Sequence, residues 1–295
     1  MKIIKYLLIL SIAPLLFSCG TDKTEESIKF FKRGNQKLKE KEYLDAIHWF
    51  DESAKQNPKF ADSYNNRGLA FQKIEKIDEA LKDFDKAIEI DKKYWEAYYN
   101  RAEALFLKGE FQNAMVDYDK LAIPFKDSSF YYVSRADTKV QLGNTSGATA
   151  DYEKAIILNP KNAEAYTNQG YLYFENKEYD LAKRSFQKAI SFDPKQDFAL
   201  NNLAFILNQE KKYDEALKMV NLALKQEPAQ PFYLNNKGLI LLNLGKLEEG
   251  KELIERSIRL NDKNGLAYQN LGIYYQKKGD NLKAKENFEI GKKLD

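Results

Sequence analysis

The stretch AEAYTNQGYLYFENKEYDLAKRSFQKAISFDPKQ, residues 163–196, decides the fold of this chain. Two small residues, Gly170 and Ala182, lie between two large aromatic ones, Tyr166 and Phe186. Small residues let two helices cross with their backbones close together, and the large residues fill the space beside the crossing. Pro194 then ends the second helix. The stretch therefore predicts two antiparallel helices that pack as a hairpin.

The same pattern recurs every 34 residues without an insertion, with repeats that start at residues 27, 61, 95, 129, 163, 197, 231 and 265. Position 20 of each repeat is Ala or Gly. Position 8 is always small: Gly34, Gly68, Ala102, Ala136, Gly170, Ala204, Gly238 and Gly272. Position 24 is always large and apolar: Phe50, Phe84, Tyr118, Tyr152, Phe186, Val220, Ile254 and Phe288. Eight unbroken units indicate a stack of helical hairpins.

This pattern resembles the tetratricopeptide repeat, whose signature combines W-x2-L-G-x2-Y, A-x3-F and a late proline. The resemblance covers residues 27–295. It implies an all-α fold, a right-handed superhelical solenoid of eight antiparallel helix pairs in which each first helix lines the concave face. Because no hairpin can bury its apolar side alone, we expect the array to fold as one cooperative unit.

One segment departs from the pattern. Repeat 3 has Leu121 where a small residue is usual, and Pro124 comes two positions early. Residues 143–147, Gly-Asn-Thr-Ser-Gly, then concentrate weak helix formers at the turn of repeat 4. We predict that residues 121–147 are the softest part of the array.

The first eighteen residues form a segment that is separate from the repeats. Lys2 and Lys5 precede an apolar run that ends in Leu16-Phe17-Ser18-Cys19, too short to span a bilayer and typical of a signal-peptide core. The ending resembles the bacterial lipobox, although Phe17 is bulkier than that family usually has there. The resemblance implies cleavage before Cys19 and acylation of Cys19; the alternative is an uncleaved signal anchor.

The lipobox resemblance predicts where the protein is located. Residues 19–26 would be the lipidated Cys and a short tether with a reach of about 25 Å, so the first repeat would lie close to the bilayer. Gly20, rather than Asp, follows the Cys. By the lipobox family's sorting rule this indicates a bacterial cell envelope lipoprotein at the outer membrane.

Composition excludes several function classes. Two of the 47 basic residues lie before Cys19, which leaves 45 against 44 acidic residues, and so mixed a charge gives no reason to expect nucleic acid. The chain has one Cys and one His, too few for the usual metal clusters. His48 is interpreted as a surface or packing residue. No phosphate loop or nucleophile elbow occurs, so we expect no enzyme, no cofactor and no metal.

The groove positions predict a binding surface. In the family, positions 2, 5, 6, 9, 12 and 13 face the concave side, and position 6 is Asn in six repeats. Carboxamides there suit a peptide backbone, or else satisfy neighbouring backbone. Apolar side chains join them in repeats 5 to 7, either for binding or for packing between helices. The predicted partner-binding residues are Asn168, Tyr171, Phe174, Phe198, Asn202, Phe205, Phe232, Asn236, Leu239, Leu242 and Asn270.

The family's clamp for acidic chaperone tails is not expected here. Asn35 and Asn66 match it, but Phe31, Glu96 and Asn100 stand where cations are required. The sequence therefore predicts a scaffold or adaptor that grips an extended or helical protein segment. A lipoprotein that binds a glycan or peptide ligand, and an accessory subunit of an enzyme, are the alternatives.

Overall fold

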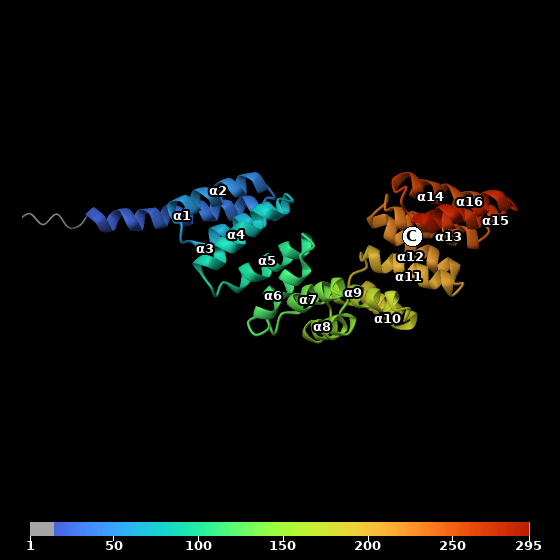
Figure 1. Ribbon diagram of the computed structural model, residues 1–295, viewed down its shortest axis with the longest axis horizontal. Coiled ribbons are helices and arrows are strands. Elements are labelled where there is room, and N and C mark those ends of the chain that lie inside the picture. Colours follow the sequence, from blue (N-terminus) through green and yellow to red (C-terminus); the bar gives the residue numbers. More distant parts are fainter. Residues whose placement is uncertain (1–14, 295) are drawn as a thin grey trace, which may run out of the picture. The chain divides into compact units, whose positions relative to one another are not determined.

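The computed structural model describes residues 15–294, with side chains from Lys23 onward, and this part of the chain forms sixteen helices and no strand (Figure 1). Their bounds are α1 (Leu15–Lys39), α2 (Tyr43–Gln56), α3 (Ala61–Lys73), α4 (Ile77–Ile90), α5 (Trp95–Leu107), α6 (Phe111–Lys120), α7 (Ser129–Gln141), α8 (Thr145–Leu158), α9 (Ala163–Glu175), α10 (Tyr179–Phe192), α11 (Asp197–Gln209), α12 (Tyr213–Gln226), α13 (Pro231–Asn243), α14 (Leu247–Leu260), α15 (Gly265–Lys277) and α16 (Asn281–Leu294). The all-α helical-repeat fold is confirmed.

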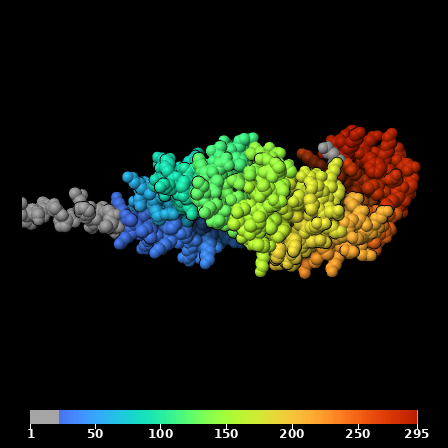
Figure 2. All heavy atoms as spheres, turned by 90° about the horizontal axis from the view of Figure 1, so that it is seen from below, coloured from blue at the N-terminus to red at the C-terminus, as the bar shows by residue number. Residues whose placement is uncertain are grey.

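The chain divides into two compact units, residues 1–126 and 127–295. Within each unit, both helices of a repeat pack against one another, and the second helix also packs against the first helix of the next repeat. Figure 2 shows the repeats of each unit following one another in chain order. The boundary falls inside residues 121–147, and the softness of that segment stays a prediction.

Each hairpin is closed around the small residue at position 8. A Cβ built on Gly68 would lie 2.7 Å from Cε1 of Phe84, and one built on Gly170 would lie 2.9 Å from the ring of Phe186. Both rings are completely buried. The two positions vary together: Phe or Ile stands at position 24 wherever position 8 is Gly, whereas Tyr or Val accompanies Ala. This pairing sets how closely the two helices of a hairpin approach.

The turn inside each hairpin has a fixed backbone shape. Position 15 of every repeat lies in the left-handed region, with φ between 61° and 82°. Four repeats place Gly there, and the others place Lys41, Glu75, Lys177 and Lys211. Only Gly adopts this conformation without a steric cost, so these four turns are held by the packing of the helices around them.

The start of α1 differs from the expected tether. The backbone from Leu15 to Lys39 is one helix, so residues 19–26 are helical rather than extended. No proline interrupts this stretch, and a helix rises about 1.5 Å per residue, so seven residues span about 10 Å instead of 25 Å. Packing nevertheless begins at Ser27, which is fully buried and donates to the carbonyl of Ser53 at 2.9 Å.

The structure describes little of the expected signal peptide. Most of the expected signal peptide, together with the side chain of Cys19, lies outside the described residues. In the described part of the chain, no helix is both long and apolar enough to cross a membrane. α6 ends at Lys120, four residues sooner than the other second helices and four residues before Pro124.

Candidate partner-binding groove

The first helices of successive repeats lie side by side in the second unit. α9 packs against α11, α11 against α13, and α13 against α15, while the second helices contact only first helices. Consecutive first helices therefore form one continuous face, as the repeat pattern predicts.

A cavity of about 420 Å³ opens on this face. Its twelve lining side chains are six aromatic rings, five carboxamides and one leucine, and none is charged. They are Tyr171, Phe174, Phe198, Asn201, Asn202, Phe205, Gln230, Phe232, Tyr233, Asn235, Asn236 and Leu266. We call this cavity the aromatic–amide groove. Its size lies in the range of pockets that accept small ligands or a few side chains of a partner.

The aromatic rings of the groove form two pairs that join α9 to α11. Tyr171 meets Phe198 with ring centroids 5.3 Å apart, and Phe174 meets Phe205 at 5.4 Å, both edge to face. Edge-to-face pairs stabilise beyond the area they bury and hold each ring in one orientation. Phe198 is still 40% exposed, and Phe232 on α13 is 47% exposed. The groove thus presents fixed apolar surface to solvent.

The carboxamides of the groove bond across the repeats. Asn236 donates to Oδ1 of Asn201 at 2.9 Å, and Asn270 donates to Oδ1 of Asn235 at 3.0 Å. In both cases position 6 of one repeat donates to position 5 of the preceding repeat. Asn202 instead donates to the carbonyl of Phe198, one turn earlier, at 2.9 Å. The amides therefore link successive repeats, and Asn202 satisfies neighbouring backbone; that the carboxamides bind a peptide backbone stays a prediction.

One amide oxygen stays open to a ligand. Within residues 23–294, every fully buried side-chain nitrogen or oxygen has a hydrogen-bond partner. No group in that range donates to Oδ1 of Asn236, which keeps contact with solvent, whereas Asn201, Asn202 and Asn235 are buried. The groove therefore offers an amide acceptor beside its aromatic rings, which suits a peptide N–H.

Tyr233 fixes one end of the groove. Its hydroxyl donates to Oδ2 of Asp197 at 2.9 Å, which ties α13 to the start of α11. Burial raises the pKa of the Tyr233 phenol well above its usual range, and the bond to Asp197 raises it further. The phenol therefore stays neutral and remains a donor at physiological pH.

Seven predicted residues line the groove and four do not. Those that line it are Tyr171, Phe174, Phe198, Asn202, Phe205, Phe232 and Asn236. Leu242 is 1% exposed and packs in the core beneath Gly250, so its assignment to the groove is wrong. Leu239 is half-buried outside the lining, and Asn168 and Asn270 are engaged with Asp137 and Asn235.

Sequence reasoning left five lining residues out of the predicted set. Asn201, Asn235 and Leu266 occupy positions 5 and 2, which the repeat pattern already assigns to this face. Gln230 and Tyr233 occupy positions 34 and 3, for which the pattern gives no signal.

A second pattern that the sequence reasoning missed lies in repeats 2 to 4. Position 7 is Arg and position 23 of the same repeat is Asp, sixteen residues later. Arg101 bonds to Asp117 through Nε at 2.7 Å, and its Nη1 reaches Asp85 of the preceding repeat at 2.6 Å. Arg67 and Arg135 pair with their own Asp in the same way. The recurring interval was visible in the sequence.

No catalytic arrangement emerges in the described residues. His48 is exposed and its ring lies 5.0 Å from that of Trp49, in keeping with a surface residue. Among the residues that the structure describes, no three His, Cys, Asp or Glu side chains gather as metal ligands.

Comparison with known families agrees with this geometry. Models described as "Tetratricopeptide repeat" match residues 61–94, 84–115, 163–196, 185–218 and 233–264, and one described as "TPR repeat" matches residues 136–177. Together they cover more than half of the sequence. The chain is a tetratricopeptide repeat protein. Proteins of this family are in general non-enzymatic scaffolds that bind other proteins or peptides.

Solved structures show the same fold. A tetratricopeptide repeat protein from Parabacteroides merdae has a TM-score of 0.64 and 18% identity, over 90% of this chain and 99% of that one. The pilF protein of Pseudomonas aeruginosa has a TM-score of 0.63 and 15% identity, over 72% and 96%.

A chain of the APC/C hetero-tetramer has a TM-score of 0.69 and 19% identity over 88% of this chain; the present chain spans about half of its length, 48%. At such identities the likeness establishes the fold. None of the curated protein sequences matches the chain.

Proposed function

We propose that this tetratricopeptide repeat protein is a bacterial envelope lipoprotein that holds a partner protein in the aromatic–amide groove. The observation that carries the proposal is the composition of the groove, in which exposed aromatic rings flank carboxamides and no charge is present. Buried aromatic anchors supply most of the energy in protein interfaces, and backbone-directed amides tolerate varied sequences. The expected occupant is an uncharged, apolar segment in extended or helical form.

The envelope location rests on the sequence before the first repeat. Leu16-Phe17-Ser18-Cys19 supports cleavage and acylation, and two or more acyl chains hold a protein firmly at a bilayer. Mass spectrometry of the mature N-terminus tests this part. A chain that starts at an acylated Cys19 is expected. An intact Met1, or an unmodified Cys19, would contradict it.

The groove is tested with Phe198→Ala. Loss of an exposed aromatic anchor is expected to weaken partner capture from detergent-solubilised membranes by about 30-fold, the equivalent of a 2 kcal/mol anchor. Phe130→Ala is the matched control, because Phe130 also occupies position 2 of its repeat, is 65% exposed and does not line the groove. Equal capture by the wild type and the Phe198→Ala variant would reject the groove as the binding site.

The same variants distinguish a glycan or peptide ligand from a protein partner. A stoichiometric protein that Phe198→Ala releases and Phe130→Ala retains supports the scaffold. Thermal stabilisation by envelope glycan fragments, lost in Phe198→Ala and without any captured protein, would replace it with the ligand-binding alternative.

A further inference from the structure

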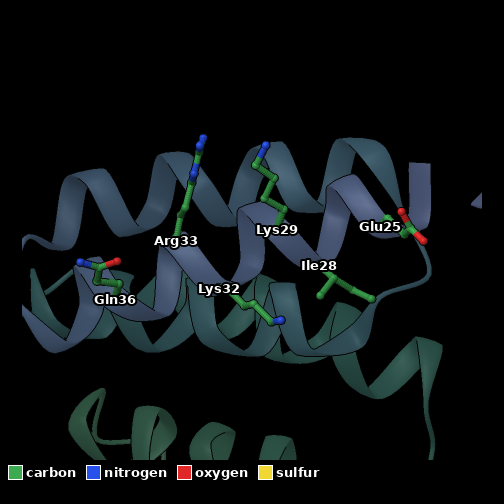
Figure 3. Close-up of a pocket in the computed structure, with 6 residues that line it drawn as sticks. All are labelled: Glu25, Ile28, Lys29, Lys32, Arg33 and Gln36. Atoms are coloured by element: carbon green, nitrogen blue, oxygen red, sulfur yellow. The ribbon is translucent and has the colours of Figure 1, made fainter. Parts of the chain in front are cut away.

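One face of α1 carries a basic patch that the groove does not explain. Figure 3 shows this face, with Lys29 and Arg33 extending from one side of the helix and Lys32 and Ile28 from the other. A shallow hollow of about 470 Å³ lies over it. We call this surface the α1 face, and its lining residues are Glu25, Ile28, Lys29, Lys32, Arg33 and Gln36.

The cations of the α1 face have no ion-pair partner among the side chains that the structure describes. Among the described residues, Lys29, Lys32 and Arg33 form no ion pair, whereas nearby Lys37 pairs with two glutamates and Lys55 with Asp51 and Glu52. Arg33 instead lies over the ring of Trp49, with 4.8 Å from its guanidinium carbon to the ring centroid. Three exposed positive charges thus face solvent against the single negative charge of Glu25.

An exposed apolar side chain lies among these charges. Ile28 is 40% exposed, although it comes directly after the buried Ser27. Cations that surround a protruding aliphatic group suit a lipid headgroup layer, because the cations contact phosphate while the aliphatic group enters the acyl boundary.

We propose that the α1 face binds anionic phospholipid headgroups. The inference rests on the proposed lipid anchor, since α1 is continuous from Leu15 and about 15 Å of helix separates Cys19 from Lys29. The bilayer that receives the acyl chains therefore lies within reach of the α1 face. Charge complementarity selects anionic lipid, and each cation near such a surface contributes about five-fold in affinity.

The experiment uses the full processed chain, added to phosphatidylcholine vesicles with or without phosphatidylglycerol. Lysine acetylation is followed by mass spectrometry at Lys29 and Lys32, with Lys92 and Lys93 as exposed controls in the same unit. We expect acetylation of Lys29 and Lys32 to slow about ten-fold with phosphatidylglycerol, while the controls are unchanged. At 1 M salt the protection should vanish, because the Debye length falls to about 3 Å.

Charge reversal adds a matched test. Lys29→Glu with Arg33→Glu is expected to abolish the protection of Lys32, while Lys92→Glu with Lys93→Glu, an equal change in net charge, leaves it intact. Equal acetylation of Lys32 on both kinds of vesicle would overturn the inference. The inference would also be overturned if the Lys29→Glu/Arg33→Glu variant released an acidic co-purifying protein and Lys32 showed no lipid-dependent protection from acetylation.

Flotation of the same samples separates this inference from the anchor. A chain that floats with both vesicles yet shows no protection keeps the anchor and overturns the α1 face as a lipid site. A chain that floats only with phosphatidylglycerol overturns the anchor and supports the α1 face. A chain that floats with neither overturns both.

Discussion

Gly68→Ala tests the size matching inside a hairpin. The new Cβ would lie 2.7, 3.0 and 3.1 Å from three ring carbons of Phe84, where ordinary contacts begin at about 3.4 Å. The Phe84 ring is completely buried and cannot swing away without displacing its neighbours. Relief therefore requires a shift of several tenths of an ångström between α3 and α4. Overpacking of this kind costs about 1–3 kcal/mol.

Helix propensity acts in the opposite direction. Ala is favoured over Gly in a helix interior by about 1 kcal/mol, so the two effects leave a net loss of about 1 kcal/mol in the free energy of unfolding. The two tryptophans, Trp49 and Trp95, both lie in residues 1–126, so their fluorescence in urea reports on the unit that contains Gly68. With a slope of about 1–2 kcal/mol per molar urea, the midpoint should fall by about 0.5–1 M.

A second substitution isolates the contact. Repeat 6 already combines Ala204 with Val220, so Phe84→Val should cost less beside Gly68→Ala than in the wild type, with a coupling of about 1 kcal/mol. A Gly68→Ala protein more stable than wild type, or two strictly additive changes, would show that propensity and not ring contact governs position 8.

Three other measurements follow from the contacts. Arg101→Met leaves the nearly buried carboxylate of Asp117 with only Lys120, at 3.3 Å, as an ion-pair partner and should cost up to about 3 kcal/mol in urea unfolding; the Arg101→Met/Asp117→Leu double variant should recover much of the loss, and no recovery would count against the pair. Because the pKa of Tyr233 is raised in the folded state, the contribution of Tyr233 to the free energy of unfolding is complete below about pH 10. This contribution is lost above that pH, where the phenol ionises in the unfolded state. Melting temperature should therefore fall more steeply between pH 9 and 11 in wild type than in Tyr233→Phe, and identical slopes would refute this. Amide exchange should be fastest within residues 121–147; slower exchange there than in the other repeats would reject the prediction of softness.

The sequence predicted the helices and their pairing because those depend on local period and on residue size. Gly170 and Phe186 report a close crossing by their sizes alone, and the partner of each residue lies sixteen residues away in the same repeat. The early end of α6, four residues before Pro124, was not predicted, although the early proline was visible in the sequence.

The features that were not predicted depend on contacts between helices or on the backbone before the first repeat. Whether Leu242 faces the groove or the core is decided by the close approach of α14 at Gly250, which a concave-face rule does not contain. The engagement of Asn236 by Asn201 likewise needs the spacing between α11 and α13. The helical course of residues 19–26 was missed because a polar composition was read as an extended tether.

Equivalent positions carry different chemistry in different repeats. Position 2 is acidic in repeats 2, 3 and 5, as Asp62, Glu96 and Glu164, but it is Phe198, Phe232 and Leu266 in repeats 6 to 8. Asp62 accepts a hydrogen bond from the hydroxyl of Tyr94 at 2.7 Å, so this site in the first unit ties the start of α3 to the start of α5 instead of offering apolar surface.

Uncharged binding surface is thus concentrated in the second unit, and the unpaired cations of the α1 face belong to the first. Because the two surfaces share no residue and use different forces, their perturbations should be independent. Lys29→Glu with Arg33→Glu should leave partner capture in detergent unchanged, and Phe198→Ala should leave the protection of Lys32 on phosphatidylglycerol vesicles unchanged. A variant that loses both properties at once would indicate that the chain acts through a single surface and would contradict this division.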